Sequence, residues 1–136
     1  MTKLTSMLKD KVEAWVEVDG FPGFEVKLAY MSRAEVEKIR KAATRNTFNK
    51  RTHLKEEEVD GELFVETLVK TSVLDWKGFT LKYASIMLPL EVPKGADLEA
   101  AIEFSKDDVL SLVKNSPIFD QWLNDTVFDL ESFRSK

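Results

Sequence analysis

The segment Val73-Leu74-Asp75-Trp76-Lys77-Gly78-Phe79-Thr80 decides the interpretation of this chain, because it follows apolar residues at helical spacing. These apolar positions are Leu63, Phe64, Leu68, Val69 and Val73. Their period predicts an amphipathic helix that ends near the large apolar Trp76, with Gly78 as its terminator. We expect the core to include four residues: Trp76, Trp122, Phe64 and Leu68.

The predicted helix begins around Glu56, because Glu56, Glu57 and Glu58 suit the positive end of a helix dipole. Gly61 inside this segment disfavours a continuous helix. The preceding residues 45–55 are polar and basic around a lone Phe48, which predicts a linking loop. Upstream of that loop, Ser32-Arg-Ala-Glu35 is a capping box, and it predicts a helix from Arg33 to about Thr44.

Two runs that alternate apolar and polar residues flank Gly20-Phe-Pro-Gly23, which is typical of a turn. Residues 15–30 therefore predict a β-hairpin. A two-stranded hairpin is marginally stable alone, so we expect its apolar face to pack on helices from the rest of the chain. Residues 1–10 predict a flexible arm or a short helix.

The last third of the chain predicts further helices separated by turns. Residues 79–90 predict an irregular passage that is helical at 81–86, and residues 97–104 predict a brief turn or strand. Ser105-Lys-Asp-Asp108 predicts the start of a short helix, and Ser116-Pro117 predicts the start of a C-terminal helix that runs to about Phe133. The chain is thus predicted to be one α+β domain over residues 1–136, with a hairpin packed on about four to five helices that occupy residues 32–136.

Composition indicates a folded domain of the cell interior. The 136 residues are 43% apolar and 32% charged, which suffices for a core without disulfide or metal support. The chain has no Cys, which excludes thiolate catalysis and suits a reducing cytosol. The sequence has neither a signal-peptide pattern nor an apolar run long enough to cross a membrane, so we expect no membrane association.

No residue pattern predicts catalysis, a cofactor or a metal. His53, the only His, lies between Arg51 and Lys55 with no carboxylate evident beside it. Phosphate-binding glycine loops are absent. The acidic pairs Glu56-Glu57-Glu58 and Asp107-Asp108 are explained by helix capping, and Asp107-Asp108 lacks the spaced ligands of a calcium loop.

The charges are divided along the chain. Residues 38–55 hold seven basic and no acidic residues, whereas residues 97–136 hold nine acidic against four basic ones. One interpretation is that both charged segments are simply exposed to solvent. A second is self-association, in which Arg40, Lys41 and Arg45 of one copy meet three acids of the next, Asp120, Asp125 and Asp129. A third is nucleic-acid binding with Phe48 as a stacking face, which the net charge of −4 disfavours.

Three segments in order resemble the tail assembly chaperones of lambda-like long-tailed bacteriophages. They are residues 22–35 (Pro-Gly-Phe-Glu-Val-Lys-Leu-Ala-Tyr-Met-Ser-Arg-Ala-Glu), residues 74–79 (Leu-Asp-Trp-Lys-Gly-Phe), and residues 104–119 with the terminal helix. The resemblance implies a non-enzymatic assembly factor of the infected bacterial cytoplasm that is absent from the finished virion. It also implies binding to the tape-measure protein, recruitment of the tail-tube protein through a frameshift-extended form, and self-association.

A chaperone of this kind needs exposed apolar surface for its client. The hairpin and the last helix have more aromatic residues than one inward-facing apolar stripe requires. The candidates for the client contact are Phe21, Phe24, Tyr30, Phe128 and Phe133. In the alternative interpretation these residues fill the core. Two rival classes of protein stay open at this point, a phage tail-completion or connector protein and a small nucleic-acid-binding regulator.

Overall fold

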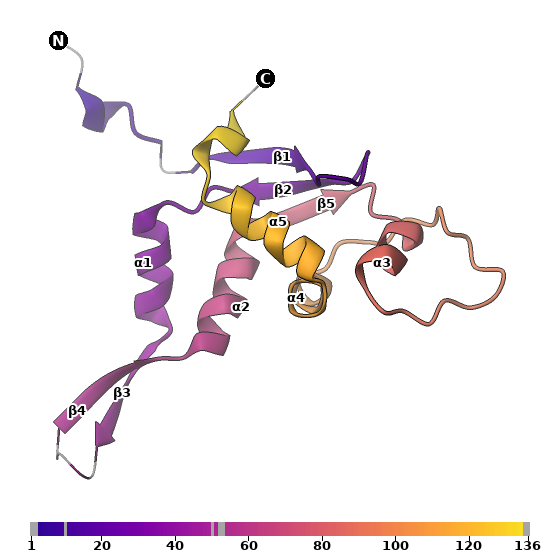
Figure 1. Cartoon of the computed structure of the whole chain (residues 1–136). Coiled ribbons are helices and arrows are strands. Elements are labelled where there is room, and N and C mark those ends of the chain that lie inside the picture. The colour runs from indigo at the N-terminus through magenta and orange to yellow at the C-terminus, as the bar shows by residue number, and fades with distance from the viewer. Residues whose placement is uncertain (1–2, 10, 50, 52–53, 135–136) are drawn as a thin grey trace.

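The computed structural model describes residues 3–9, 11–49, 51 and 54–134, without the side chains of residues 45–49 and 54–57. The α-helices of these residues are α1 (Arg33–Ala42), α2 (Gly61–Ser72), α3 (Leu81–Met87), α4 (Lys106–Asn115) and α5 (Pro117–Val127). The strands are β1 (Glu13–Glu17), β2 (Glu25–Ala29), β3 (Thr44–Asn49), β4 (Leu54–Val59) and β5 (Val73–Lys77), and two 3₁₀ turns are η1 (Leu4–Ser6) and η2 (Leu130–Phe133). The predicted α+β class is confirmed (Figure 1).

The predicted hairpin is confirmed, and it belongs to a larger sheet. Strands β1 and β2 pair antiparallel, and β2 also pairs antiparallel with β5, so β2 is the central strand. The turn between β1 and β2 uses Gly20 and Gly23 at positive φ. The sheet therefore joins two segments that lie almost fifty residues apart in the chain.

The helix predicted to end at Trp76 and Gly78 stops earlier, at Ser72, and residues 73–77 form β5. Val73 and Trp76 of this strand are buried, and Val26 of β2 lies opposite Trp76. The apolar residues 69 and 73 satisfy a helical spacing, but burial in the sheet requires residue 73 to be extended. The prediction was wrong in conformation, while the core position of Trp76 is confirmed.

The loop predicted over residues 45–55 and the helix start predicted at Glu56 are also wrong. Strands β3 and β4 form a separate two-stranded antiparallel ribbon that extends from the end of α1 (Figure 1). Its register places Arg45 opposite Glu58 and Thr47 opposite Glu56. Residues 32–136 were predicted to be helical, but they also contain the strands β3, β4 and β5.

Helix α2 begins at Gly61, behind the cap residue Asp60. The side chain of Asp60 accepts a hydrogen bond from the backbone N–H of Leu63, which satisfies one free donor of the first turn. Gly61 therefore opens the helix and does not divide it. Glu56, Glu57 and Glu58, the predicted dipole partners, lie in β4 instead.

The other predicted helix starts are confirmed by their caps. The side-chain oxygens of Ser32, Ser105 and Ser116 accept hydrogen bonds from the backbone N–H three residues onward, at the starts of α1, α4 and α5. Helix α3 begins in the same way behind Thr80. Helix α5 ends at Val127, however, and the residues to Phe133 form η2, so the last helix is shorter than predicted.

The helices cover one side of the sheet, and the core lies between these two layers (Figure 1). Phe24 is fully buried at its centre, stacked on Phe79 with 4.6 Å between ring centroids. The indole N–H of Trp76 donates a 2.8 Å hydrogen bond to the carbonyl of Ile102, which ties β5 to the segment before α4. Among the described residues, no helix is long and apolar enough to span a membrane.

Candidate binding surface

The aromatic residues that the sequence offers as partner contacts divide into two groups in the structure. Phe21, Phe24 and Phe133 are buried, so the expectation that they form exposed surface is wrong, and they fill the core as in the alternative interpretation. Tyr30 is half-buried, with its ring 5.6 Å from that of Phe133. Phe128 is 41% exposed and is the one exposed member of the five.

Packing explains why these aromatics are internal. Phe21 meets Tyr83 edge to face at 5.2 Å, and the hydroxyl of Tyr83 donates a hydrogen bond to the carbonyl of Pro22. Phe133 closes the end of the sheet, because η2 folds back beside β1. Aromatic side chains bury large apolar areas, and four rings pack around Phe24: Trp76, Phe79, Tyr83 and Phe119.

Phe128 belongs to an apolar groove between α2 and α5, which we call the α2–α5 groove. Its volume is about 380 Å³. It is lined by Phe64, Val65, Leu68, Val69 and Ser72 of α2, Val113 of α4, and Asp120, Leu123, Asn124, Val127 and Phe128 at α5. Val65 is exposed among these lining residues, so apolar surface of the groove is open to solvent.

The predicted core residues Phe64 and Leu68 are only half-buried, because they line this groove. Their helical spacing predicted the inner face of α2 correctly. It could not show that α5 would leave part of this face uncovered. Trp122, by contrast, is buried as predicted.

The polar side of the α2–α5 groove is acidic. Asp120 and Asn124 lie in it, and the amide of Asn124 donates to the Asp120 carboxylate at 3.1 Å. Helix α5 carries the acids Asp120 and Asp125 and has neither Lys nor Arg in its sequence. An apolar segment with basic ends would therefore fit this groove in both shape and charge.

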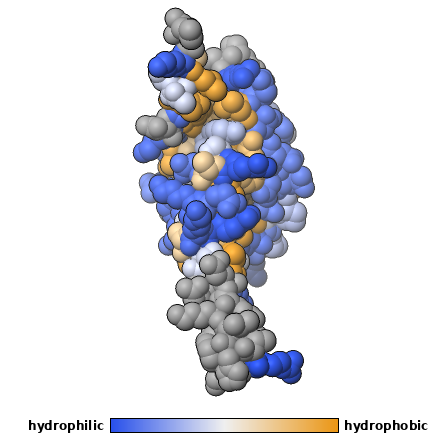
Figure 2. All heavy atoms as spheres, turned by 90° about the vertical axis from the view of Figure 1, so that its left-hand side faces the viewer, coloured by the Kyte–Doolittle hydropathy of each residue, from blue (hydrophilic) through white to orange (hydrophobic). Residues whose placement is uncertain are grey.

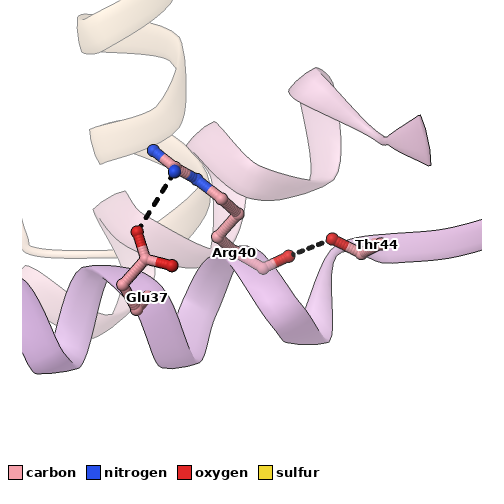
Figure 3. Close-up of polar contacts among 3 residues, drawn as sticks. All are labelled: Glu37, Arg40 and Thr44. Carbon is pink, nitrogen blue, oxygen red and sulfur yellow. Dashed lines mark hydrogen bonds and ion pairs between the residues drawn. The ribbon is translucent and has the colours of Figure 1, made fainter. Parts of the chain in front are cut away.

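Of the basic residues predicted for self-association, Arg40 has contacts within its own chain. The Arg40 guanidinium forms a 3.1 Å ion pair with Glu37, one turn earlier in α1 (Figure 3). It also lies 5.9 Å from the centre of the Phe64 ring. The carbonyl of Arg40 accepts a hydrogen bond from the hydroxyl of Thr44. Lys41 is exposed, and the side chain of Arg45 lies outside the described residues.

The acids of the predicted interface are on or beside α5. Asp125 accepts hydrogen bonds from the amide of Gln121, and Asp129 caps η2 through the N–H of Glu131. Within the described residues, no ion pair joins these acids to the basic residues of α1. Whether they meet in a second copy therefore stays a prediction. The outer face of α1 is mainly hydrophilic, with hydrophobic surface beside it (Figure 2).

A second hollow, of about 730 Å³, lies between β1 and the C-terminal segment, with Trp122, Phe133 and Arg134 among its lining residues. Strand β1 is the edge of the sheet, and Trp15 on it is partly exposed below the ammonium of Lys77, 4.5 Å from the ring centre. No nucleophile and base converge in it.

The described residues contain no group of three or more His, Cys, Asp or Glu side chains that could hold a metal. His53 lies outside them. Lys106 is the one described group with a shifted pKa: partial burial and the nearby charge of Lys70 lower it, and its ammonium donates to the carbonyls of Lys70 and Val73. Those bonds are structural, because both acceptors belong to the end of α2.

Comparisons with protein-family models, with curated proteins and with solved structures find no match for this chain. The function is therefore argued from the residues and their arrangement. The α2–α5 groove is the feature that sequence reasoning missed, apart from Phe128. Its signal was the apolar surplus of α2, where Leu63 and Val65 widen the stripe beyond one face.

Proposed function

We propose that this chain is a tail assembly chaperone of a long-tailed bacteriophage. In this proposal it acts by non-covalent binding in the cytoplasm of the infected bacterium, keeps the tape-measure protein soluble and promotes polymerisation of the tail tube around it. The tube protein is recruited through a frameshift-extended form, and the chaperone is left out of the virion. The ordered resemblance of residues 22–35, 74–79 and 104–119 supports the family.

The α2–α5 groove is the observation that carries the binding mode. A tape-measure protein presents long amphipathic helices, and an open apolar groove between two helices takes the apolar face of a third. Phe128 and Val65 stand at its opening as exposed anchors, where truncation of an aromatic side chain weakens an interface most.

The modest size of the groove suits a chaperone that must release its client. A groove of about 380 Å³ accepts a few side chains at a time. Many such weak contacts along a long helix keep it soluble, yet each can be displaced by a tube subunit that covers more of the same helix. Release then needs no covalent step.

The test is co-expression with the tape-measure protein of the same phage. The wild-type chain should raise the soluble fraction of that protein and co-purify with it. Phe128→Ser should lower the co-purified amount several-fold, because the exposed ring at the groove is lost. Failure of the wild-type chain to bind or to solubilise the tape-measure protein would overturn the proposal.

The matched control is Ile86→Ser, which removes another exposed apolar side chain, on α3 and outside the groove. It should bind the tape-measure protein as the wild type does. Equal losses in both variants would mean that the groove is not the binding site. Ile86→Ser should change the free energy of unfolding by less than about 0.5 kcal/mol. Phe128 is 41% exposed, so Phe128→Ser also removes some buried apolar area, and binding should be compared well below the melting temperatures of both variants.

A further inference from the structure

The N-terminal arm, residues 3–9, carries apolar side chains that nothing in the described chain covers. Leu4, Met7 and Leu8 are 72%, 58% and 68% exposed. The arm stands away from the sheet and the helices (Figure 1), and the hydrogen bonds of its turn stay within it, from Ser6 and Met7 to the carbonyls of Lys3 and Leu4. Three exposed apolar side chains within five residues are a mark of association.

The spacing of these residues in the sequence is that of an amphipathic helix turn, although η1 itself ends at Ser6. Leu4, Met7 and Leu8 have the spacing i, i+3 and i+4, which places side chains on one face of a helical turn. Turn η1 already begins at Leu4. The arm also carries Lys3 and Lys9, so its apolar face is flanked by positive charge.

The α2–α5 groove has the complementary properties. Its lining is mainly apolar, and its charged lining residue is Asp120; Asp125 lies outside the lining, five residues further along the same helix, which has no basic residue. The groove and the arm of one chain are separate surfaces: the lining residues come from α2, α4 and α5, while the arm leads into β1. The occupant that matches the groove in shape and charge is therefore the arm of a second copy.

We propose that, in the free protein, the arm of one copy binds in the α2–α5 groove of the next, with Leu4, Met7 and Leu8 on the apolar floor and Lys3 and Lys9 toward Asp120 and Asp125. The arm and the groove are different surfaces, so the contact between two copies is head to tail. Each added copy still offers a free groove or a free arm, so the oligomer can grow. In its relation to the client, the inference rests on the proposed function: the arm covers the groove until the tape-measure protein displaces it.

Oligomer mass tests the contact without any tape-measure protein. In sedimentation velocity, the wild type should grow in mass with concentration, and Leu4→Ser/Met7→Ser/Leu8→Ser should remain monomeric. Phe128→Ser should shift the dissociation constant upward by tenfold or more, and Ile86→Ser should behave as the wild type. Circular dichroism and thermal unfolding of the arm variant should match the wild type, because its side chains are outside the core.

The absence of Cys from the chain allows a direct test of proximity. Met7→Cys and Val65→Cys, mixed and mildly oxidised, should form a disulfide-linked heterodimer in high yield. Met7→Cys mixed with Ile86→Cys should give at most a background yield, since α3 does not line the groove. Equal yields in the two mixtures would overturn the proposed contact.

The outcomes separate this contact from the other possibilities. A wild type that stays monomeric at all concentrations overturns the inference and leaves client binding by the groove to be judged by co-expression. An oligomer lost in Arg40→Glu/Lys41→Glu but kept in the arm variant also overturns it, because the charged face of α1 would then form the interface. Loss of client binding with an intact oligomer would instead contradict the proposed function alone.

Discussion

Lys106 shows how one side chain completes two elements. Its ammonium donates 2.6 Å hydrogen bonds to the carbonyls of Lys70 and Val73, where α2 ends and β5 begins. The last carbonyls of a helix lack partners within it, and a cation also suits the negative end of the helix dipole. Partial burial, together with the charge of Lys70, lowers the pKa of Lys106 below its ordinary value of 10.5.

Lys106→Met should destabilise the fold, because it removes the donors of two carbonyls. Hydrogen bonds to charged groups suggest a loss of about 1–3 kcal/mol in the free energy of unfolding. Because the pKa of Lys106 is lower in the folded protein, the unfolded chain binds more protons at this residue at pH values between the folded pKa and 10.5. The contribution of Lys106 to the free energy of unfolding therefore rises with pH in that range. Urea unfolding of both proteins from neutral pH toward pH 10 should show a growing difference; a difference that shrinks would contradict this account.

Gly78 is required by a close approach between two turns. Its φ is +73°, and a Cβ there would collide with the backbone carbonyl of Gly23. Gly78→Ala should therefore cost more than the roughly 1 kcal/mol of an unfavourable backbone region. Gly95→Ala is the control, since Gly95 also has positive φ but faces open space. Melting temperatures should fall further for Gly78→Ala; equal shifts would remove the collision as the cause.

At the scale of single residues, the sequence predicted burial well and exposure poorly. Trp76 and Trp122 are buried as predicted, because large apolar residues at regular spacing have few alternatives. Phe24 and Phe133 were wrongly expected at the surface. The expectation considered only the apolar stripe of one helix, and it left out the aromatic residues that the sheet and η2 also place in the core. Phe128 is exposed, but only its position beside α2 makes it part of a groove.

At the scale of elements, caps were the dependable signal. Ser116 closes α4 and opens α5, it is buried, and its hydroxyl accepts from the N–H of Phe119 at 3.2 Å. A Ser followed by Pro at the first helical position fixes a boundary locally, so the sequence alone determines it. The strands were less visible, because the partner of β5 lies almost fifty residues away and β3 and β4 lack an alternating apolar pattern.

Ser116→Ala should lower the free energy of unfolding by about 1 kcal/mol, the usual cost of a lost N-cap. Ser111→Ala, at an exposed position within α4, is the control and should have little effect. Chemical denaturation followed by circular dichroism measures both. A loss no larger than that of the control would show that the cap does not stabilise the boundary.

Strand β5 and the ribbon β3–β4 could not be predicted locally. Residues 69 and 73 keep helical spacing, and nothing in the neighbouring sequence shows that β2 needs a second partner. Glu56, Glu57 and Glu58 suit a helix start, but in the structure they lie along β4 opposite residues 45–47, which include one basic residue. For β5 a long-range pairing overrides the local preference, whereas β3 and β4 pair with each other as a local hairpin whose polar and charged residues show no apolar alternation.

For the whole molecule, the layers predict a gradient of local stability. Strand β2 pairs on both edges and carries the buried Val26 and Leu28, whereas the arm is exposed. Hydrogen exchange should therefore be slowest in β2 and fastest in residues 3–9 of the dilute protein. At high concentration the arm should gain protection if it binds a second copy, and mass spectrometry of the exchanged peptides can follow this. Faster exchange in β2 than in α1 would contradict the layered description.

The α+β class and the packing of the hairpin on helices were predictable for the whole chain, because they follow from periodicity and turn residues. The α2–α5 groove was not, since it depends on the separation of two helices about fifty residues apart. A groove of this kind forms where two helices leave part of their apolar faces uncovered. Sequence patterns report the apolar faces of elements and say little about which part of a face remains open.

The central position of β2 has a consequence for biosynthesis. Its two neighbours are made at different times, β1 just before it and β5 only when synthesis reaches Lys77. The ring of Phe24 has a further neighbour, Phe119, which is translated later still. During translation the hairpin therefore keeps an uncovered aromatic surface until α5 has been synthesised. A nascent chain halted before that point is the form that cellular quality-control factors would recognise.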